Sequence, residues 1–218
     1  MQLFTGICSS DFINVFGIEN GFEKIKQCGF DSVEIDLTFF KEKLLLDDKG
    51  LKNFFSSLKK SVTDNGLNIC QTYISFDDEV DINLRKELAE RTVFATSTLG
   101  ARFAVIEPII LGDAENTYVQ NFKQNLEFYG SLKALAQNTG VKIAIPNMAG
   151  YNQLKKAGAP NACSSAGKIL QLLDVLGDEF CACLDTNRAY YVGQRPCETA
   201  KILGEKLKVL RLSDSDGL

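Results

Sequence analysis

Short apolar runs alternate with longer segments of helical periodicity along the whole chain, and this alternation constrains the fold more than any other feature. Between Thr117 and Thr139, apolar side chains recur at steps of three and four residues, which is the spacing of one buried helix face. Seven apolar runs are predicted to be strands: Gln2–Cys8, Ser32–Leu37, Asn68–Ser75, Phe103–Glu107, Lys142–Pro146, Cys181–Asp185 and Lys208–Ser213. Six helices are predicted between them: Gly21–Cys28, Lys49–Asn65, Asn83–Leu99, Thr117–Thr139, Ala166–Leu176 and Glu198–Leu203.

Glycines close most of the predicted helices. Gly29, Gly66, Gly100, Gly140 and Gly177 each follow a helical segment, where a left-handed backbone favours glycine. Strands that alternate with helices predict a parallel sheet with right-handed crossovers, as a (β/α)8 barrel or as an open doubly wound sheet. No glycine-rich phosphate-binding motif follows any predicted strand, so the nucleotide-binding form of the open sheet loses its main support.

The composition excludes several classes of function. The chain has no histidine among its 218 residues, which excludes catalytic triads, imidazole bases and histidine metal ligands. A net charge of −4 argues against a nucleic-acid binder. No apolar stretch is long enough to span a membrane, and the start of the chain does not resemble a signal peptide. The seven cysteines include no C-x-x-C pair and are expected to be reduced and mostly buried. We therefore expect a cytoplasmic protein that binds neither nucleic acid nor membranes.

Polar side chains gather at the carboxyl ends of the predicted strands, which is the functional edge of both parallel folds. These side chains are Glu34, Asp36, Glu107, Asn147, Asp185, Asp214 and Asp216. A long loop, Asn147–Ser165, is predicted after the fifth strand, and such loops often close over a ligand.

Four segments at predicted strands carry a resemblance to a known family. They are GFDSVEI from residue 29, VKIAIPNM from residue 141, CLDTNRA from residue 183 and LRLSDSDG from residue 210. In this order they resemble the sugar phosphate isomerase/epimerase superfamily, the xylose isomerase-like TIM barrels. The resemblance covers essentially the whole chain. It implies one α/β domain over residues 1–218, a TIM (β/α)8-type barrel that is incomplete because seven strands are visible and the eighth is missing. A fragment, an edge closed by a second copy or another chain, and a natural open variant are the three interpretations of this end.

The same resemblance implies a divalent metal (Mn, Mg or Zn), yet the expected ligand positions have changed. Pro146 stands where the fifth strand would supply a metal-binding glutamate, and Arg188 and Arg211 replace histidines of the sixth and seventh strands. The two guanidinium groups would repel a dication and pair with the same carboxylates. Asp185 and Asp214 are the remaining metal-ligand candidates.

The resemblance implies a sugar (phosphate) isomerase/epimerase that acts on a small sugar or polyol by proton transfer between adjacent carbons. Glu34 and Asp185 are then the catalytic candidates, and the substrate-binding candidates are Glu107, Asn147, Arg188 and Arg211. The alternative is a catalytically inactive barrel that binds a sugar or a small anion, the anion being held by Arg188, Arg211 and Arg195. Structural roles are also open, because the arginines can form simple ion pairs and Asp185 can hold its own loop. DNA repair of the apurinic-endonuclease type shares the fold but needs a histidine-rich zinc site.

Overall fold

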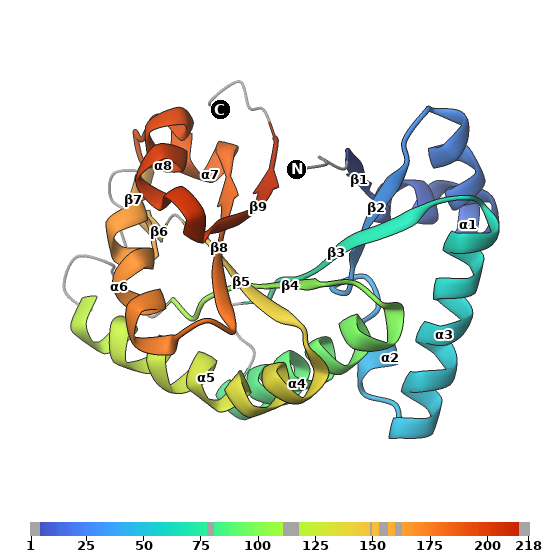
Figure 1. The fold of residues 1–218 in the computed structure, drawn as a ribbon, viewed down its shortest axis with the longest axis horizontal. Coiled ribbons are helices and arrows are strands. Elements are labelled where there is room, and N and C mark those ends of the chain that lie inside the picture. Colours follow the sequence, from blue (N-terminus) through green and yellow to red (C-terminus); the bar gives the residue numbers. More distant parts are fainter. Residues whose placement is uncertain are drawn as a thin grey trace. The chain divides into compact units, whose positions relative to one another are not determined.

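The computed structural model describes residues 5–77, 81–110, 118–148, 150–152, 157–159 and 163–213. The chain forms two compact units, one of Met1–Ala104 with Leu135–Val141 and one of Val105–Ala134 with Lys142–Leu218 (Figure 1). Strand β4 (Phe103–Ile106) and helix α5 (Tyr118–Thr139) each contribute residues to both units.

The first unit contains three parallel strands in the order β1-β2-β3. Its elements are β1 (Gly6–Cys8), α1 (Ser10–Gln27), β2 (Ser32–Asp36), α2 (Lys41–Leu44), α3 (Asp48–Asp64), β3 (Asn68–Ile74) and α4 (Ile82–Leu99). Helix α3 shows why the sequence folds this way. The Asp47 side chain accepts a hydrogen bond from Gly50 N at 2.8 Å and caps the helix. The apolar face from Leu51 to Val62 is buried against the neighbouring elements α4 and β3.

The second unit contains three parallel strands in the order β5-β8-β9. Its elements after α5 are β5 (Lys142–Pro146), β6 (Gly150–Asn152), β7 (Ala157–Ala159), α6 (Ala166–Leu176), β8 (Phe180–Asp185), α7 (Thr186–Tyr191), α8 (Pro196–Leu203), a 3-10 turn (Gly204–Lys206) and β9 (Leu207–Arg211). Every residue of β8 is buried, as expected of a central strand covered on both faces.

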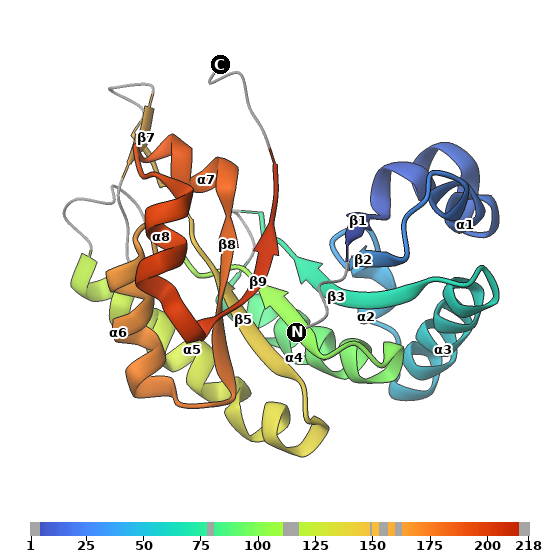
Figure 2. The same cartoon turned by 45° about the horizontal axis from the view of Figure 1, so that its top comes forward.

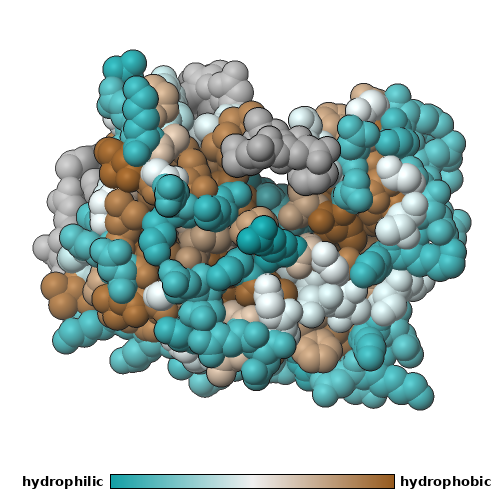
Figure 3. Space-filling model, in the orientation of Figure 1, coloured by the Kyte–Doolittle hydropathy of each residue, from teal (hydrophilic) through white to brown (hydrophobic). Residues whose placement is uncertain are grey.

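Helices α6 and α8 lie side by side and both contact β8 (Figures 1 and 2). Their outer surfaces expose the apolar side chains of Val175 and Ile202, and Figure 3 shows hydrophobic surface in this part of the molecule. The buried side of α6, which includes Ile169, Leu172 and Leu173, carries the periodicity that predicted this helix.

The predicted strands and helices are present, with differences of a few residues at most ends. Gly29, Gly66, Gly100, Gly140 and Gly177 all have positive φ angles, which confirms their predicted role as helix terminators. The largest difference in length is α1, which begins at Ser10 rather than Gly21. Gly17 has φ of 76° inside this helix and interrupts the apolar repeat that prediction depends on.

Five short elements were not predicted: α2, β6, β7, α7 and the 3-10 turn Gly204–Lys206. Helix α2 and helix α7 are too short to show helical periodicity. The predicted loop Asn147–Ser165 does connect β5 to α6, and it contains an antiparallel hairpin, β6 with β7. Backbone pairing rather than a side-chain pattern defines a hairpin of three-residue strands. Within the described residues, no helix has the length and apolar character needed to cross a membrane.

All seven cysteines are free thiols, and their exposure differs sharply. Cys163, Cys181 and Cys183 are buried, whereas Cys28 and Cys197 are exposed. Burial raises the pKa of the Cys163 thiol to about 12, because the protein interior solvates a thiolate poorly. Since the thiolate is the reactive form, Cys163 is chemically inert in the folded protein.

This difference predicts two classes of thiol. With Ellman's reagent at pH 8, we expect Cys28 and Cys197 to react fast and Cys163 to react only after unfolding. A pKa near 12 leaves about one thiol in ten thousand ionised at that pH. The double variant Cys28→Ser/Cys197→Ser should lose the fast phase in a stopped-flow absorbance measurement. A fast phase of unchanged amplitude in this variant would contradict the assignment.

Candidate functional site

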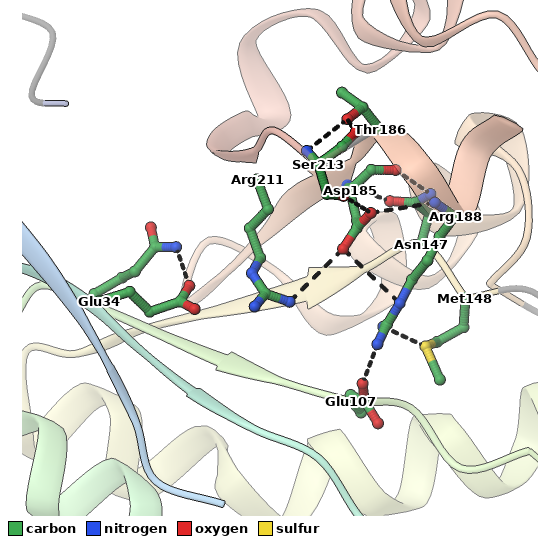
Figure 4. A network of polar contacts seen from close by, with 10 residues as sticks. Glu34, Glu107, Asn147, Met148, Asp185, Thr186, Arg188, Arg211 and Ser213 are labelled. Atoms are coloured by element: carbon green, nitrogen blue, oxygen red, sulfur yellow. Dashed lines mark hydrogen bonds and ion pairs between the residues drawn. The ribbon is translucent and has the colours of Figure 1, made fainter. Parts of the chain in front are cut away.

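Two acidic and two basic side chains meet in the second unit, at the carboxyl ends of its strands (Figure 4). Glu107 directly follows β4, Asp185 ends β8, Arg188 lies in α7 and Arg211 ends β9. The parallel topology gathers these residues because successive strands end at the same edge of the sheet. Sequence analysis predicted all four as site residues.

Arg188 connects two buried carboxylates. Its Nη2 donates to Glu107 Oε1 at 2.5 Å, and its Nε lies 3.9 Å from Asp185 Oδ2. Its Nη1 also contacts the Met148 sulfur. The side chains of Glu107 and Asp185 are only 6% and 9% exposed. A buried carboxylate needs a charged or hydrogen-bonded partner, and Arg188 supplies one to both.

The two carboxylate oxygens of Asp185 have different surroundings. Oδ1 accepts hydrogen bonds from Arg188 N and from Ser213 Oγ, each at 3.1 Å. Oδ2 faces Arg211 Nη1 at 3.7 Å and Arg188 Nε at 3.9 Å. Both of these distances exceed a hydrogen bond. Among the described residues, Oδ2 therefore accepts no hydrogen bond, although two cations lie beside it.

Asn147 fixes the main chain of Asp185. Its Nδ2 donates to Asp185 O at 3.0 Å, and its Oδ1 accepts from Asp185 N at 2.6 Å. The side-chain amide thus continues the β5–β8 pairing beyond the end of the strands. Its role in substrate binding stays a prediction. The observed contacts of Asn147 hold the main chain of Asp185 in place.

A second pair of hydrogen bonds, a clamp between Thr186 and Ser213, holds the chain after β9. Thr186 Oγ1 donates to Ser213 O at 2.8 Å and accepts from Ser213 N at 3.0 Å. This clamp places the Ser213 hydroxyl beside Asp185. Sequence analysis did not single out Thr186, Ser213 or Met148, although all three lie in or beside the segments that carry the resemblance.

Helix α5 secures the segment that carries Glu107. The fully buried Tyr129 hydroxyl donates to Ile106 O at 2.8 Å, and burial raises the pKa of Tyr129 well above its usual value. The Asn125 amide bonds both the N and the O of Ile109 at 2.8 Å. Glu107 is therefore held between two anchored residues.

The other predicted site residues lie elsewhere in the chain. Glu34 belongs to the first unit, where it is buried on β2 and accepts a 2.5 Å hydrogen bond from Gln71 Nε2 of β3. Arg195 is 74% exposed and pairs with Glu198 at 2.9 Å. Asp214 lies outside the described residues.

Among the described residues of the second unit, the donor atoms do not fit a divalent metal. Within the described residues, no three His, Cys, Asp or Glu side chains are grouped so as to hold one. Pro146 ends β5 without a donor atom in its side chain, and both nearby carboxylates are compensated by arginines. A dication at Asp185 would meet two guanidinium groups of the same sign.

Comparison with known proteins places the chain in a family. A family model described as a xylose isomerase-like TIM barrel matches residues 22–218. The chain belongs to the xylose isomerase-like TIM-barrel family. This confirms the predicted TIM-type α/β fold and the resemblance that suggested it. No curated protein matches the sequence.

Several solved structures share this fold at low sequence identity. A D-psicose 3-epimerase crystallised in the presence of D-fructose is 17% identical with a TM-score of 0.71, over 95% of this chain and 72% of its own. For 3-keto-D-glucoside 4-epimerase from E. coli the values are 15% and 0.69, over 90% and 74%. For a sugar phosphate isomerase/epimerase from Parabacteroides distasonis they are 16% and 0.63, over 94% and 73%. At identities this low, the structural similarity establishes the shared fold alone.

The Asn147 contacts predict a large loss of stability on truncation. Asn147→Ala leaves the N–H and C=O groups of Asp185 without these partners, and each such buried group costs about 1–3 kcal/mol. We expect the free energy of unfolding in urea to fall by about 2–4 kcal/mol. The exposed Asn138→Ala on α5 is the control and should change it by less than about 0.5 kcal/mol. Equal effects in the two variants would show that the Asn147 bonds contribute little.

Proposed function

We propose that this protein is a sugar (phosphate) isomerase/epimerase that acts on a small sugar or polyol by moving a proton between adjacent carbon atoms. Membership of the xylose isomerase-like family supports this proposal, as do the epimerases among the proteins of similar fold. The observation that carries it is the Asp185 carboxylate, which is buried, fixed through one oxygen and flanked by two arginines at the other. The free thiols support a cytoplasmic location as part of the same proposal.

The chemistry asked of this site is a proton transfer next to a carbonyl group. Asp185 Oδ2 takes the proton from the carbon atom, and the electron pair moves onto the carbonyl oxygen. A guanidinium beside that oxygen stabilises the negative charge, since Arg188 and Arg211 stay protonated at any working pH. The carboxyl group then returns the proton to the former carbonyl carbon, while the hydroxyl proton of the first carbon moves to the negatively charged oxygen, so that the carbonyl group is re-formed one carbon further along. Glu34 is the second proposed catalytic carboxylate, and its hydrogen bond from Gln71 holds it in one orientation.

A binding protein without catalysis is the second candidate. One observation favours it: Glu107 and Asp185 already engage Arg188, so a substrate must compete with these contacts or add to them. In that case the cluster retains a sugar or small anion and performs no proton transfer.

Solvent deuterium separates the two candidates. In D2O, an active enzyme should introduce deuterium at the carbon beside the carbonyl of D-fructose, D-tagatose, D-psicose or one of their phosphates, measured by loss of the proton NMR signal. Asp185→Asn should slow this exchange about a hundredfold or more, because general-base catalysis contributes about that factor. Glu34→Gln tests the second carboxylate in the same assay.

Arg102→Gln is the control, because this exposed arginine lies at the amino end of β4 and its loss should leave exchange unchanged. No exchange with any sugar of the panel would favour the binding protein. Exchange at the wild-type rate in Asp185→Asn would remove Asp185 from the catalytic role.

A further inference from the structure

We propose that Asp185 Oδ2, Arg188 and Arg211 form a metal-independent site for an uncharged hydroxyl or carbonyl group of a sugar, at the position where family resemblance implies a divalent cation. The inference rests on the proposed function and specifies its substrate class at this cluster as neutral rather than phosphorylated.

The first step concerns Asp185 Oδ2 and its hydrogen bonds. The Asp185 side chain is 9% exposed, and its Oδ2 accepts no hydrogen bond from any described residue. Oδ2 does not belong to the fully enclosed polar atoms that lack a partner, and a carboxylate oxygen can accept two hydrogen bonds. The nearest cations, at 3.7 and 3.9 Å, give Coulombic stabilisation without closing a hydrogen bond. Oδ2 is therefore an acceptor held ready for a donor from outside the cluster.

The second step is the chemistry of that donor. A sugar hydroxyl donates one hydrogen bond and accepts others through the same oxygen. It can donate to Oδ2 while accepting from a guanidinium N–H beside it, so that one oxygen atom uses both charges. An adjacent carbonyl oxygen can accept from the second guanidinium. Two arginines from different elements, α7 and β9, thus favour a ligand with neighbouring oxygen atoms.

The third step is the charge. Glu107 and Asp185 carry two negative charges and Arg188 and Arg211 carry two positive charges, so these four groups balance. A phosphate placed against Oδ2 would meet a carboxylate at contact distance, and like charges in a buried setting repel strongly. A divalent cation would meet two guanidiniums. A neutral polar group avoids both penalties.

The fourth step is rigidity. Asn147 holds the Asp185 main chain, Ser213 and Arg188 N hold Oδ1, and Glu107 holds the Arg188 guanidinium. The carboxylate therefore points Oδ2 in a fixed direction before any ligand arrives. Such pre-organisation reduces the entropy lost on binding.

The test measures binding rather than turnover, using the full chain and isothermal titration calorimetry. The probes are D-fructose, D-tagatose and D-psicose, each with excess EDTA and again with added MnCl2. We expect at least one sugar to bind with the same affinity in both conditions. Asp185→Asn and Arg211→Gln should each weaken binding at least about tenfold, since each removes a hydrogen bond that involves a charged group. Arg102→Gln, at an exposed arginine outside the cluster, should bind as the wild type does.

Several results would overturn the proposal. They are sugar binding that needs Mn, binding unchanged in both site variants, no binding of any of the three sugars, and displacement of a bound sugar by inorganic phosphate. Melting curves of Asp185→Asn establish that this variant is folded, and Arg211→Gln, at a residue on the edge strand of the second unit, provides an independent variant.

The two proposals fail in different ways. Metal-independent sugar binding that depends on Asp185, without deuterium exchange in the wild type, would support the site and reject the enzyme. Deuterium exchange that requires Mn would support the enzyme and reject the metal-independent site.

Discussion

One guanidinium compensates two buried carboxylates, and the arrangement of the second unit's strand ends depends on it. Glu107 and Asp185 come from different strands, and neither is tolerated in the interior without a cation or hydrogen-bond donors. Arg188 reaches both from the short helix α7, which Asp185 itself begins by capping Arg188 N. The helix, the ion pairs and the orientation of Asp185 therefore form one interdependent structure. Hydrogen bonds from Asn147 to the Asp185 main chain and from Ser213 to its carboxylate then fix the position of Asp185.

Much of the fold could be predicted because it depends on local pattern. The strands of the βα repeat are buried apolar runs, and the glycines after the helices have the positive φ angles that their positions indicated. Helix α7 and the hairpin β6–β7 could not be predicted in this way. The first depends on a single capping carboxylate and the second on backbone pairing, and neither produces a periodic signal.

The sequence predicted which residues form the site, but not the contacts of their individual atoms. Parallel topology alone brings Glu107, Asp185 and Arg211 to one edge of the sheet, so their grouping follows from their places at strand ends. The unequal surroundings of Oδ1 and Oδ2 do not follow, because they depend on rotamers and on the Ser213 hydroxyl. The Met148 contact was missed for the same reason. Position in the sequence predicts which residues meet, whereas packing determines which atoms remain available.

The pairing of Glu107 with Arg188 also has a consequence for how this protein can change over generations. The two residues are 81 positions apart in the chain, yet a substitution of either one changes the charge of the same cluster, because Arg188 also faces Asp185 at 3.9 Å. A single replacement therefore unbalances the cluster, whereas replacing Glu107 and Arg188 together by neutral residues keeps its net charge. A divalent cation at Asp185 would require Arg188 to be replaced, and Glu107 would then lose this ion-pair partner.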